Sequence, residues 1–271
     1  MGADDPLIAG GLMSQALCGV HAQAARRHWW FQGRRIILRS LLATLLPPGP
    51  ERLVVEVGCG TGENLAWLSQ DYQVLGVEPS PPAAGEARNQ VAPDRVIQTD
   101  TPDDVPDYQR ADAVLILDVL EHVEEDAVVL NRWVAPMKDG CLLLVTVPAD
   151  PALWSRHDET YGHYRRYELG GFRRLLESQP VELLLISYFN ARLYWLIRAA
   201  RSISYRLHRT WGPNGTDLWI PPSWLNGLLA KIFSGEARRL VRCLRAGSRR
   251  SAWHRGVSLV AAARRRYAAD K

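Results

Sequence analysis

The feature that most constrains the fold is a β-branched run that ends abruptly in glycines. Residues 52–57 are mostly valine and leucine, and Gly58, Gly60 and Gly62 follow at alternate positions before a helical pattern begins. Glycine lacks a Cβ atom, so such a loop can turn sharply and let a ligand approach the backbone closely. This order of strand, glycine turn and helix predicts a ligand-binding loop at the carboxyl edge of a parallel sheet.

Short apolar runs alternate with helical patterns through residues 1–150. Further strands are expected at 73–78, 95–98, 112–118 and 141–147, with helices between them at 63–69, 83–90 and 124–134. Continuous Val, Ile and Leu runs are typical of parallel strands buried on both faces. The pattern predicts a Rossmann-like, doubly wound α/β sheet.

The pattern changes after Pro148. Two more strands are expected at 181–187 and 256–263, and the 68 residues between them are too many for a bare loop. Two amphipathic helices are predicted there, at 191–208 and 224–245. On the first, we expect Leu193, Leu196, Ile197, Ala200, Ile203 and Leu207 to face the protein, with Tyr194, Trp195, Tyr205 and the arginines on the opposite face.

Four segments are therefore expected. Residues 1–50 form an N-terminal helical segment, loosely structured up to residue 22, in which the aromatic stretch 28–35 could serve as a lid. Residues 51–190 form the ligand-binding core, and 191–250 form a helical insertion that either caps the acceptor or faces a membrane. Residues 251–271 contain the last strand and a tail.

Charge is distributed unevenly along the chain. Residues 1–150 carry a net charge of −10 and residues 151–271 a net charge of +14, which the overall +4 conceals. A basic half can attract anionic lipid, nucleic acid or a phosphorylated substrate, or its arginines can simply face water. Basic residues beside aromatic ones on an amphipathic helix suit an anionic membrane surface.

Neither a membrane span nor a secretory signal is expected. No apolar stretch reaches the roughly 20 residues that a span needs, and no basic start precedes an apolar run. We expect a cytoplasmic protein, with peripheral attachment to the inner face of the membrane as an open alternative. The four cysteines form no CxxC pair and are expected to be free thiols.

The main alternative for the glycine loop is a dinucleotide site. In the motif GxGxxG the third glycine would fall on Glu63, whose carboxylate would repel a pyrophosphate. A sulfonium cofactor carries no phosphate and tolerates that residue. Glu78 ends the next strand 16 residues after Gly62, where a carboxylate can accept both hydroxyls of a ribose.

These motifs resemble those of class I S-adenosylmethionine-dependent methyltransferases. Glu56, Gly58, Gly60 and Gly62 match the pattern ExGxGxG, and the resemblance continues through Glu78, Asp100 and the LDVLEHV run at 117–123. The sequence is most similar to the type-11 group, which includes quinone-biosynthesis methyltransferases. The resemblance covers about residues 52–147 well and implies a seven-stranded sheet with an antiparallel last strand and S-adenosylmethionine as cofactor.

The resemblance also implies which residues hold the cofactor. Glu78 would hold the ribose, and Asp100 would bind the adenine amino group with Thr99 beside it. Glu56 and the backbone of residues 58–60 would face the methionine part. The full expected set is Glu56, Gly58, Cys59, Gly60, Gly62, Glu78, Thr99, Asp100 and Asp118.

Two groups of residues are candidates for handling the methyl acceptor. His122 follows the fourth strand, and a neutral imidazole there could take a proton from a hydroxyl. The stretch 154–167 follows the fifth strand and is dense in His, Tyr and Arg. Within it His163 is a second candidate base, while Tyr161, Arg165 and Arg166 are expected to bind the acceptor, the arginines by gripping an anionic group. The alternative for this stretch is a hydrogen-bonded structural loop.

The spacing is compatible with a metal site formed by His157, Asp158 and His163, but no bound metal is expected. The sequence predicts an enzyme that methylates a small-molecule or lipid-type acceptor; oxygen or carbon is favoured as the methylated atom, and nitrogen stays open as an alternative. No Asn-Pro-Pro-Tyr type tetrad follows the fourth strand, which argues against nucleic acid as partner. Two alternatives stay open, a non-catalytic cofactor-binding scaffold and an RNA methyltransferase that uses the basic half.

Overall fold

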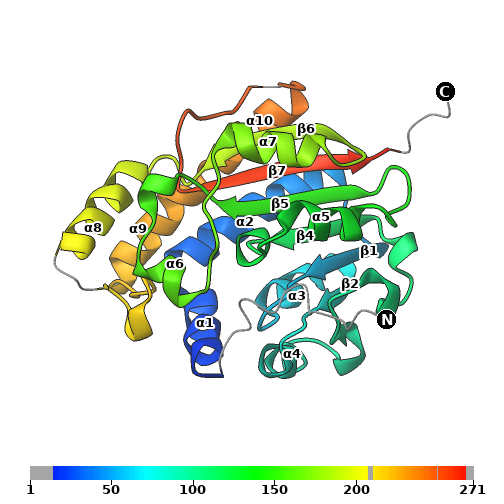
Figure 1. Cartoon of the computed structure of the whole chain (residues 1–271), viewed down its shortest axis with the longest axis horizontal. Helices are drawn as coiled ribbons and strands as arrows, with labels where there is room; N and C mark the ends of the chain where they lie inside the picture. The colour runs from blue at the N-terminus through cyan, green and yellow to red at the C-terminus, as the bar shows by residue number, and fades with distance from the viewer. Residues whose placement is uncertain (1–14, 207–209, 249, 267–271) are drawn as a thin grey trace.

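A computed structural model describes residues 15–206, 210–248 and 250–266. Seven strands form one sheet in the order β3–β2–β1–β4–β5–β7–β6 (Figure 1). Only β7 runs antiparallel to its neighbours β5 and β6, which confirms the doubly wound sheet with an antiparallel last strand. The strands are β1 Gly49–Val57, β2 Tyr72–Val77, β3 Val96–Ile97, β4 Ala113–Leu117, β5 Leu142–Pro148, β6 Val181–Phe189 and β7 Ser258–Arg265.

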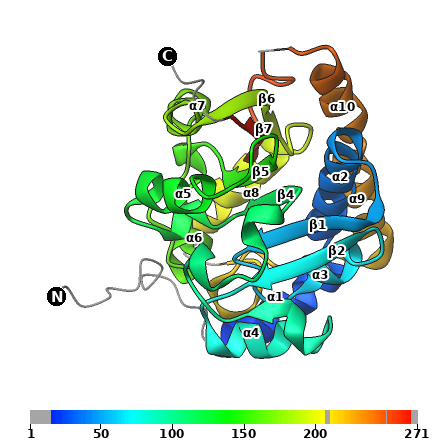
Figure 2. The same cartoon turned by 90° about the vertical axis from the view of Figure 1, so that its right-hand side faces the viewer.

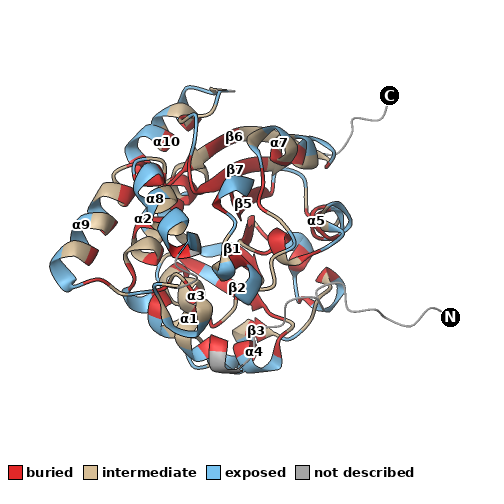
Figure 3. Ribbon diagram, turned by 60° about the vertical axis from the view of Figure 1, so that its left-hand side comes forward, coloured by how far each residue is buried: buried red, intermediate tan, exposed pale blue. Residues whose placement is uncertain are grey.

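Helices cover both faces of the sheet (Figure 2). Successive residues of a strand point to opposite faces, so Val55 packs in one core cluster with α5 and α7 while Val54 packs in the other with α2, α3 and α10. Figure 3 shows the strands as the most deeply buried layer. The helices are α1 Gln15–Arg27, α2 Trp29–Leu45, α3 Glu63–Leu68, α4 Pro81–Ala87, α5 Asp126–Val134, α6 Arg156–Thr160, α7 Leu169–Glu177, α8 Tyr194–Arg206, α9 Ser223–Ser234 and α10 Ala237–Arg245.

The strand order places a crevice where β1 and β4 lie side by side. From β1 the chain continues outward to β2 and β3, and from β4 it continues in the other direction. Connections that leave in opposite directions open a gap at the carboxyl ends of these two strands. This edge of the sheet is therefore where the fold itself provides room for a ligand.

The N-terminal segment is more ordered than the sequence suggests. Residues 15–22 were expected to be loosely structured, yet they belong to α1. Cys18, Ala24 and Ala25 are buried, and the helix contacts α2, α3 and α4. Its small buried side chains give only a weak hydrophobic pattern in the sequence. The helix is stabilised mainly by packing against other helices, which the sequence of this segment does not reveal.

The described part of the insertion contains three α-helices where two were predicted. The expected helix at 224–245 is broken between α9 and α10 at Gly235 and Glu236. The buried Glu236 carboxylate turns there to accept hydrogen bonds from the backbone N–H groups of Ala191 and Arg192, at 2.9 and 2.8 Å. This contact fastens the insertion to the end of β6.

The predicted faces of α8 are correct only in part. Leu193 and Ile197 pack inside as expected. Tyr194 was expected on the opposite face but is buried, whereas Leu196 and Ile203 are 60% and 49% exposed. The hydroxyl of Tyr194 donates to Asp150, and Arg201 pairs with Asp217 at 3.0 Å, so the polar groups find partners inside the protein. Residues 207 and 208 of the predicted helix lie outside the described residues. None of the helices in the described part of the chain combines the length and apolar character needed to cross a bilayer.

Candidate active site

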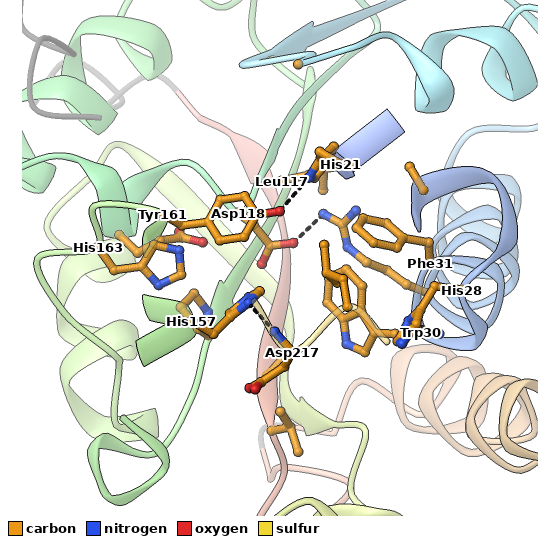
Figure 4. Close-up of a pocket in the computed structure, with 18 of the residues that line it drawn as sticks. His21, His28, Trp30, Phe31, Leu117, Asp118, His157, Tyr161, His163 and Asp217 are labelled. Carbon is orange, nitrogen blue, oxygen red and sulfur yellow. Dashed lines mark hydrogen bonds and ion pairs between the residues drawn. The ribbon is translucent and has the colours of Figure 1, made fainter. Parts of the chain in front are cut away.

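A cavity of about 880 Å³ opens at the carboxyl ends of β1, β2, β4 and β5. We call the part lined by Gly58, Gly60 and Glu78 the glycine-loop end, and the part lined by Glu121, His122 and His163 the histidine end. In Figure 4, Asp118 lies between the two sides of the cavity. His157, Tyr161 and His163 are on one side, and His21, His28, Trp30 and Phe31 are on the other.

The glycines of the loop adopt conformations that other residues avoid. Gly58, Gly60 and Gly62 have φ angles of 69°, 55° and 85°, in the left-handed region. A Cβ on Gly58 would lie 2.5 Å from Cγ2 of Val119, whereas one on Gly60 would meet nothing within 4 Å. Gly58 is therefore required by packing, and Gly60 leaves open space beside the cavity.

Glu78 is fixed by the same loop. Its Oε2 accepts a hydrogen bond from the backbone N–H of Gly60 and its Oε1 one from that of Ser80, both at 2.9 Å. Burial raises the pKa of this carboxyl group, and the two backbone donors oppose that shift. Each carboxylate oxygen has a second lone pair, so Glu78 can still accept hydrogen bonds from a ligand in the cavity.

Glu56 lies beneath the loop rather than on the cavity wall. Its Oε1 accepts a hydrogen bond from Nδ2 of Asn64 at 2.6 Å, and Asn64 lines the cavity. Burial raises the pKa of Glu56 to about 7, although the Asn64 hydrogen bond and the charge of Arg34 oppose this shift. Within the described chain its Oε2 has no hydrogen-bond partner.

Arg34 connects the N-terminal segment to the middle of the cavity. Its guanidinium, which is buried, pairs with Asp118 at 2.5 Å and donates to Oγ1 of Thr146 at 3.2 Å. The same group lies over the ring of Trp30, 5.1 Å from its centre. The stretch that the sequence suggested as a lid thus lines the cavity from α2, with Trp30 and Phe31 among its wall residues.

The histidine end is organised by one buried carboxylate. Asp158, on α6, is fully buried and accepts hydrogen bonds from Nδ1 of His163 at 2.9 Å and Nε of Arg166 at 2.8 Å. Burial alone would raise the pKa of Asp158, but His163, Arg166 and Arg201 hold it well below its usual range. Because a carboxylate only accepts, Nδ1 of His163 carries a proton and points to Asp158, and Nε2 is the ring nitrogen left without that partner.

His122 and Glu121 face His163 from the turn Leu120–His122, which follows β4. The rings of the two histidines lie at 85° to each other with centroids 4.7 Å apart. Burial, together with the charge of His163, lowers the pKa of His122 to about 3, so its imidazole is neutral. Ligand atoms of Glu121, His122 and His163 all lie within 4.8 Å of one another.

The rest of the cavity has an apolar wall, which comes mainly from the insertion. Its members are Leu17, Leu196, Ile197, Ala200, Trp211, Leu218, Trp219, Pro221 and Leu229. Asn226 holds the insertion against the N-terminal segment, since its side chain accepts from the N–H of Trp29 and donates to the carbonyl of Arg27, both at 2.9 Å. Segments nearly 200 residues apart in sequence therefore close this side together.

A family model described as a methyltransferase domain matches residues 29–214, which is more than half of the chain. The chain belongs to this methyltransferase family. Its cofactor is S-adenosylmethionine, and it is an enzyme that transfers the methyl group. Among curated proteins, none matches the methyltransferase in sequence.

Solved structures support the same fold. The methyltransferase matches the plantazolicin methyltransferase BpumL in complex with SAH with a TM-score of 0.57 and 14% identity, over 96% of this chain and 94% of that one. It matches a possible histamine N-methyltransferase from Thermotoga maritima with a TM-score of 0.51 and 16% identity, over 93% and 97%. For geranyl diphosphate C-methyltransferase from Streptomyces coelicolor A3(2) the values are 0.53 and 16%, over 97% and 88%.

The residues at the glycine-loop end fit this cofactor. A fixed carboxylate with free lone pairs suits ribose hydroxyls, and the open space at Gly60 admits a ligand against the backbone. Glu63 stands at the start of α3, where a pyrophosphate would otherwise bind, and a sulfonium cofactor has none. The glycine-loop end therefore suits a nucleoside that carries no phosphate.

The structure brings together most, but not all, of the predicted site residues. Gly58, Cys59, Gly60, Glu78, Asp118, His122, Tyr161, His163 and Arg166 line the cavity. Five predicted site residues, all within the described part of the chain, do not line it: Glu56, Gly62, Thr99, Asp100 and Arg165. Thr99 instead bonds to Asp104, and the Arg165 guanidinium pairs with Asp126 at 3.2 Å on the outer side of its loop.

Several cavity residues carry no signal in the sequence. His21, on the helix that was not expected, approaches the hydroxyl of Tyr161 at 3.4 Å. Arg201 and Asp217 come from the insertion and complete the ion-pair network around Asp158. Their spacing along the chain follows no motif, so only the fold reveals that they meet.

Proposed function

We propose that the methyltransferase methylates an oxygen or carbon atom of a small hydrophobic or lipid-type acceptor. The observation that carries this proposal is the cavity, which extends from the glycine loop past two histidines to the apolar wall. A hydrocarbon ring or chain would be removed from water against that wall, whereas a strongly polar acceptor would find few partners there. The motif resemblance to the type-11 group, with its quinone-biosynthesis members, favours the same class of acceptor.

At the glycine-loop end, Glu78 would accept hydrogen bonds from the ribose hydroxyls and the backbone of residues 58–60 would lie against the methionine part. Glu56 would act through Asn64, which it orients. Thr99 and Asp100 remain the proposed adenine contacts, in which case the adenine extends beyond the cavity toward the loop after β3. Asp118, held by Arg34, would border the cofactor on the acceptor side.

His122 and His163 are the proposed catalytic residues. S-Adenosylmethionine supplies a methyl group on a positively charged sulfur, so the main task of the chain is to hold the acceptor atom in line with that bond. The histidines present ring nitrogens to the same part of the cavity, where they would contact a reacting oxygen. Asp158 keeps His163 from rotating, and Arg166, engaged by Asp158, supports the loop rather than gripping an anion.

The outer segments would enclose the acceptor. We propose that residues 1–50 and 191–250 act as one cover, because Asn226 joins them and both contribute to the apolar wall. In this arrangement the acceptor is shielded from water while the methyl group is transferred. Shielding strengthens the electrostatic interactions inside the site.

Delivery from an anionic membrane is part of this proposal. Trp195 on α8 and Trp224 on α9 are 65% and 72% exposed, and Trp195 precedes wall residue Leu196 in the chain. The guanidinium groups of Arg198 and Arg255 lie 5.9 and 5.7 Å from the ring of Trp195. Aromatic rings flanked by cations suit the headgroup region of a bilayer.

Two experiments test the proposal. Purified enzyme with methyl-labelled S-adenosylmethionine is incubated with hydrophobic metabolite and lipid fractions or with total RNA, and Glu78→Ala is the inactive control. Label in the lipid fraction supports the proposal, and label only in RNA overturns it in favour of the RNA alternative. Sedimentation with anionic vesicles should weaken with added salt and in a Trp195→Ser, Trp224→Ser variant; no binding at low salt would remove the membrane step.

A further inference from the structure

We propose that Glu121, His122 and His163 form a binding site for a divalent transition-metal cation at the histidine end of the cavity. This inference rests on the proposed function and deepens it, since the cation would hold the reacting oxygen of the acceptor. The sequence predicts no bound metal, and the only metal site that its spacing suggests is formed by His157, Asp158 and His163. The fold instead turns Asp158 away as a partner of His163 and brings Glu121 and His122 to the site.

The three side chains are held together by two segments of backbone. Glu121 and His122 lie on the single turn Leu120–His122 that follows β4, and His163 lies in the loop after α6. The N–H of Tyr164 donates to the carbonyl of Glu121 at 2.7 Å, which fastens one segment to the other. Ligand atoms within 4.8 Å of one another are close enough to share one ion.

Two of the three side chains have buried atoms with no partner. Oε2 of Glu121 and Nδ1 of His122 are both buried and accept no hydrogen bond within the described chain. Glu121 is only 1% exposed, yet it lines the cavity. Buried polar atoms are almost always satisfied in native proteins, so an unsatisfied pair that faces one cavity points to a ligand.

The charges around the site leave room for a cation. Three carboxylates near the histidine end each have an arginine: Asp118 pairs with Arg34, Asp158 with Arg166 and Asp217 with Arg201. Over the described ranges, Glu121 has no such ion pair. A divalent cation would supply the missing positive charge and allow Glu121 to be ionised where it is buried.

Groups behind the ligands orient them as in established metal sites. Asp158 accepts the Nδ1 proton of His163, which leaves Nε2 free to bind an ion. A hydrogen bond with the backbone of Tyr161 holds the His122 ring, whose Nδ1 remains unpartnered. Metal-binding histidines commonly donate their other N–H to a carboxylate or a carbonyl in this way.

The ligand set indicates the class of metal and its role. Two imidazoles and one carboxylate suit Zn²⁺, Mn²⁺, Fe²⁺ or Co²⁺ better than Ca²⁺ or Mg²⁺, which prefer oxygen ligands. Three protein ligands leave a coordination position open toward the cavity. An acceptor hydroxyl bound there would release its proton to water more readily, and its oxygen would be held at a defined place.

The test measures metal binding without any acceptor. Tag-free protein, dialysed against chelator, is titrated with Co²⁺ while its visible absorption is recorded. We expect one Co²⁺ per chain, no comparable binding in Glu121→Gln or His163→Ala, and roughly 10–100-fold weaker binding in Asp158→Asn. His254→Ala, at an exposed histidine, is the matched control and should bind Co²⁺ as the wild type does.

Binding of S-adenosylhomocysteine, measured by calorimetry, identifies which variants are folded. Absence of a cobalt spectrum in the folded wild type would overturn the proposal, as would a Glu121→Gln variant that binds Co²⁺ normally. Full activity on a lipid-type acceptor in the presence of chelator, without cobalt binding, would overturn the metal site and leave the proposed function intact. One Co²⁺ per chain in a protein that methylates only RNA would support the site and overturn the proposed acceptor.

Discussion

The two ends of the cavity are built in different ways. The glycine-loop end comes from one short segment and the end of the neighbouring strand, and its groups are backbone atoms and a carboxylate held by them. The histidine end and the apolar wall beside it come from α1, α2, the turn after β4, the loop after α6 and the insertion, which are spread from residue 17 to residue 229. This difference teaches that a local motif can carry the chemistry shared by a family. The groups proposed to contact the acceptor, in contrast, meet only after folding.

The largest expected effect distinguishes catalysis at the histidine end from cofactor binding at the glycine-loop end. We expect His163→Ala to lower kcat by about 10²- to 10⁴-fold, the range for losing a group that acts on the reacting oxygen, either directly or by holding the proposed cation. Affinity for S-adenosylmethionine should stay unchanged, because His163 lies away from the glycine loop. Single-turnover rates and calorimetry measure the two quantities, and an alanine variant with wild-type turnover would contradict the division.

Two substitutions in the glycine loop compare the effect of packing on stability with the effect of ligand access on cofactor binding. Gly58→Ala should destabilise the fold by about 2–4 kcal/mol, since a left-handed conformation and a contact with Val119 both oppose the added Cβ. Gly60→Ala meets no neighbour and should cost only about 1 kcal/mol of stability while weakening cofactor binding. Denaturant unfolding and calorimetry decide between them; equal losses of stability would mean that the Val119 contact is unimportant.

The next prediction compares two carboxylates proposed for the cofactor. Glu78→Ala should weaken S-adenosylmethionine binding by about 1.5–3 kcal/mol, the usual effect of losing hydrogen bonds to a charged group. Asp100→Ala should have a smaller effect, because Asp100 does not line the cavity. Calorimetric titration of both variants is the measurement. A larger loss at Asp100 would place the main nucleoside contact after β3 instead.

The last prediction concerns pH and uses two buried carboxylates, one beneath the glycine loop and one that anchors the insertion. Burial raises the pKa of Glu56 and of Glu236 from 4.5 to about 7. The folded protein therefore holds these protons more tightly than the unfolded chain, and stability should fall as pH rises from about 4.5 to about 7, by about 3 kcal/mol for each group.

Glutamine variants sharpen this test because glutamine cannot ionise. Glu56→Gln and Glu236→Gln should each flatten the dependence of unfolding free energy on pH, as measured by denaturant titrations across that range. Only Glu56→Gln should also alter cofactor affinity, since Glu236 anchors the insertion through Ala191 and Arg192. An unchanged pH profile in both variants would show that neither carboxyl group titrates in this window.

Much of the core was predictable because its signals are local. The apolar runs that form β1, β4 and β5 are read from consecutive residues, and a doubly wound sheet follows from their alternation with helices. The insertion was harder. Its hydrophobic pattern predicted inward Leu196 and Ile203, but the half-buried partners Asp150 and Asp217 draw Tyr194 and Arg201 inward instead.

The sequence by itself determined the sheet, the glycine loop and the methyltransferase family, since each depends on the conformations of neighbouring residues. Only the tertiary structure decided which side chains face the acceptor. It turned Arg165 outward, engaged Arg166 with Asp158 and placed Glu121 beside two histidines. Arg166 and Asp158 are only eight residues apart. The positions of Arg165 and Glu121, in contrast, depend on contacts between segments more than 30 residues apart, which no pattern of adjacent residues encodes.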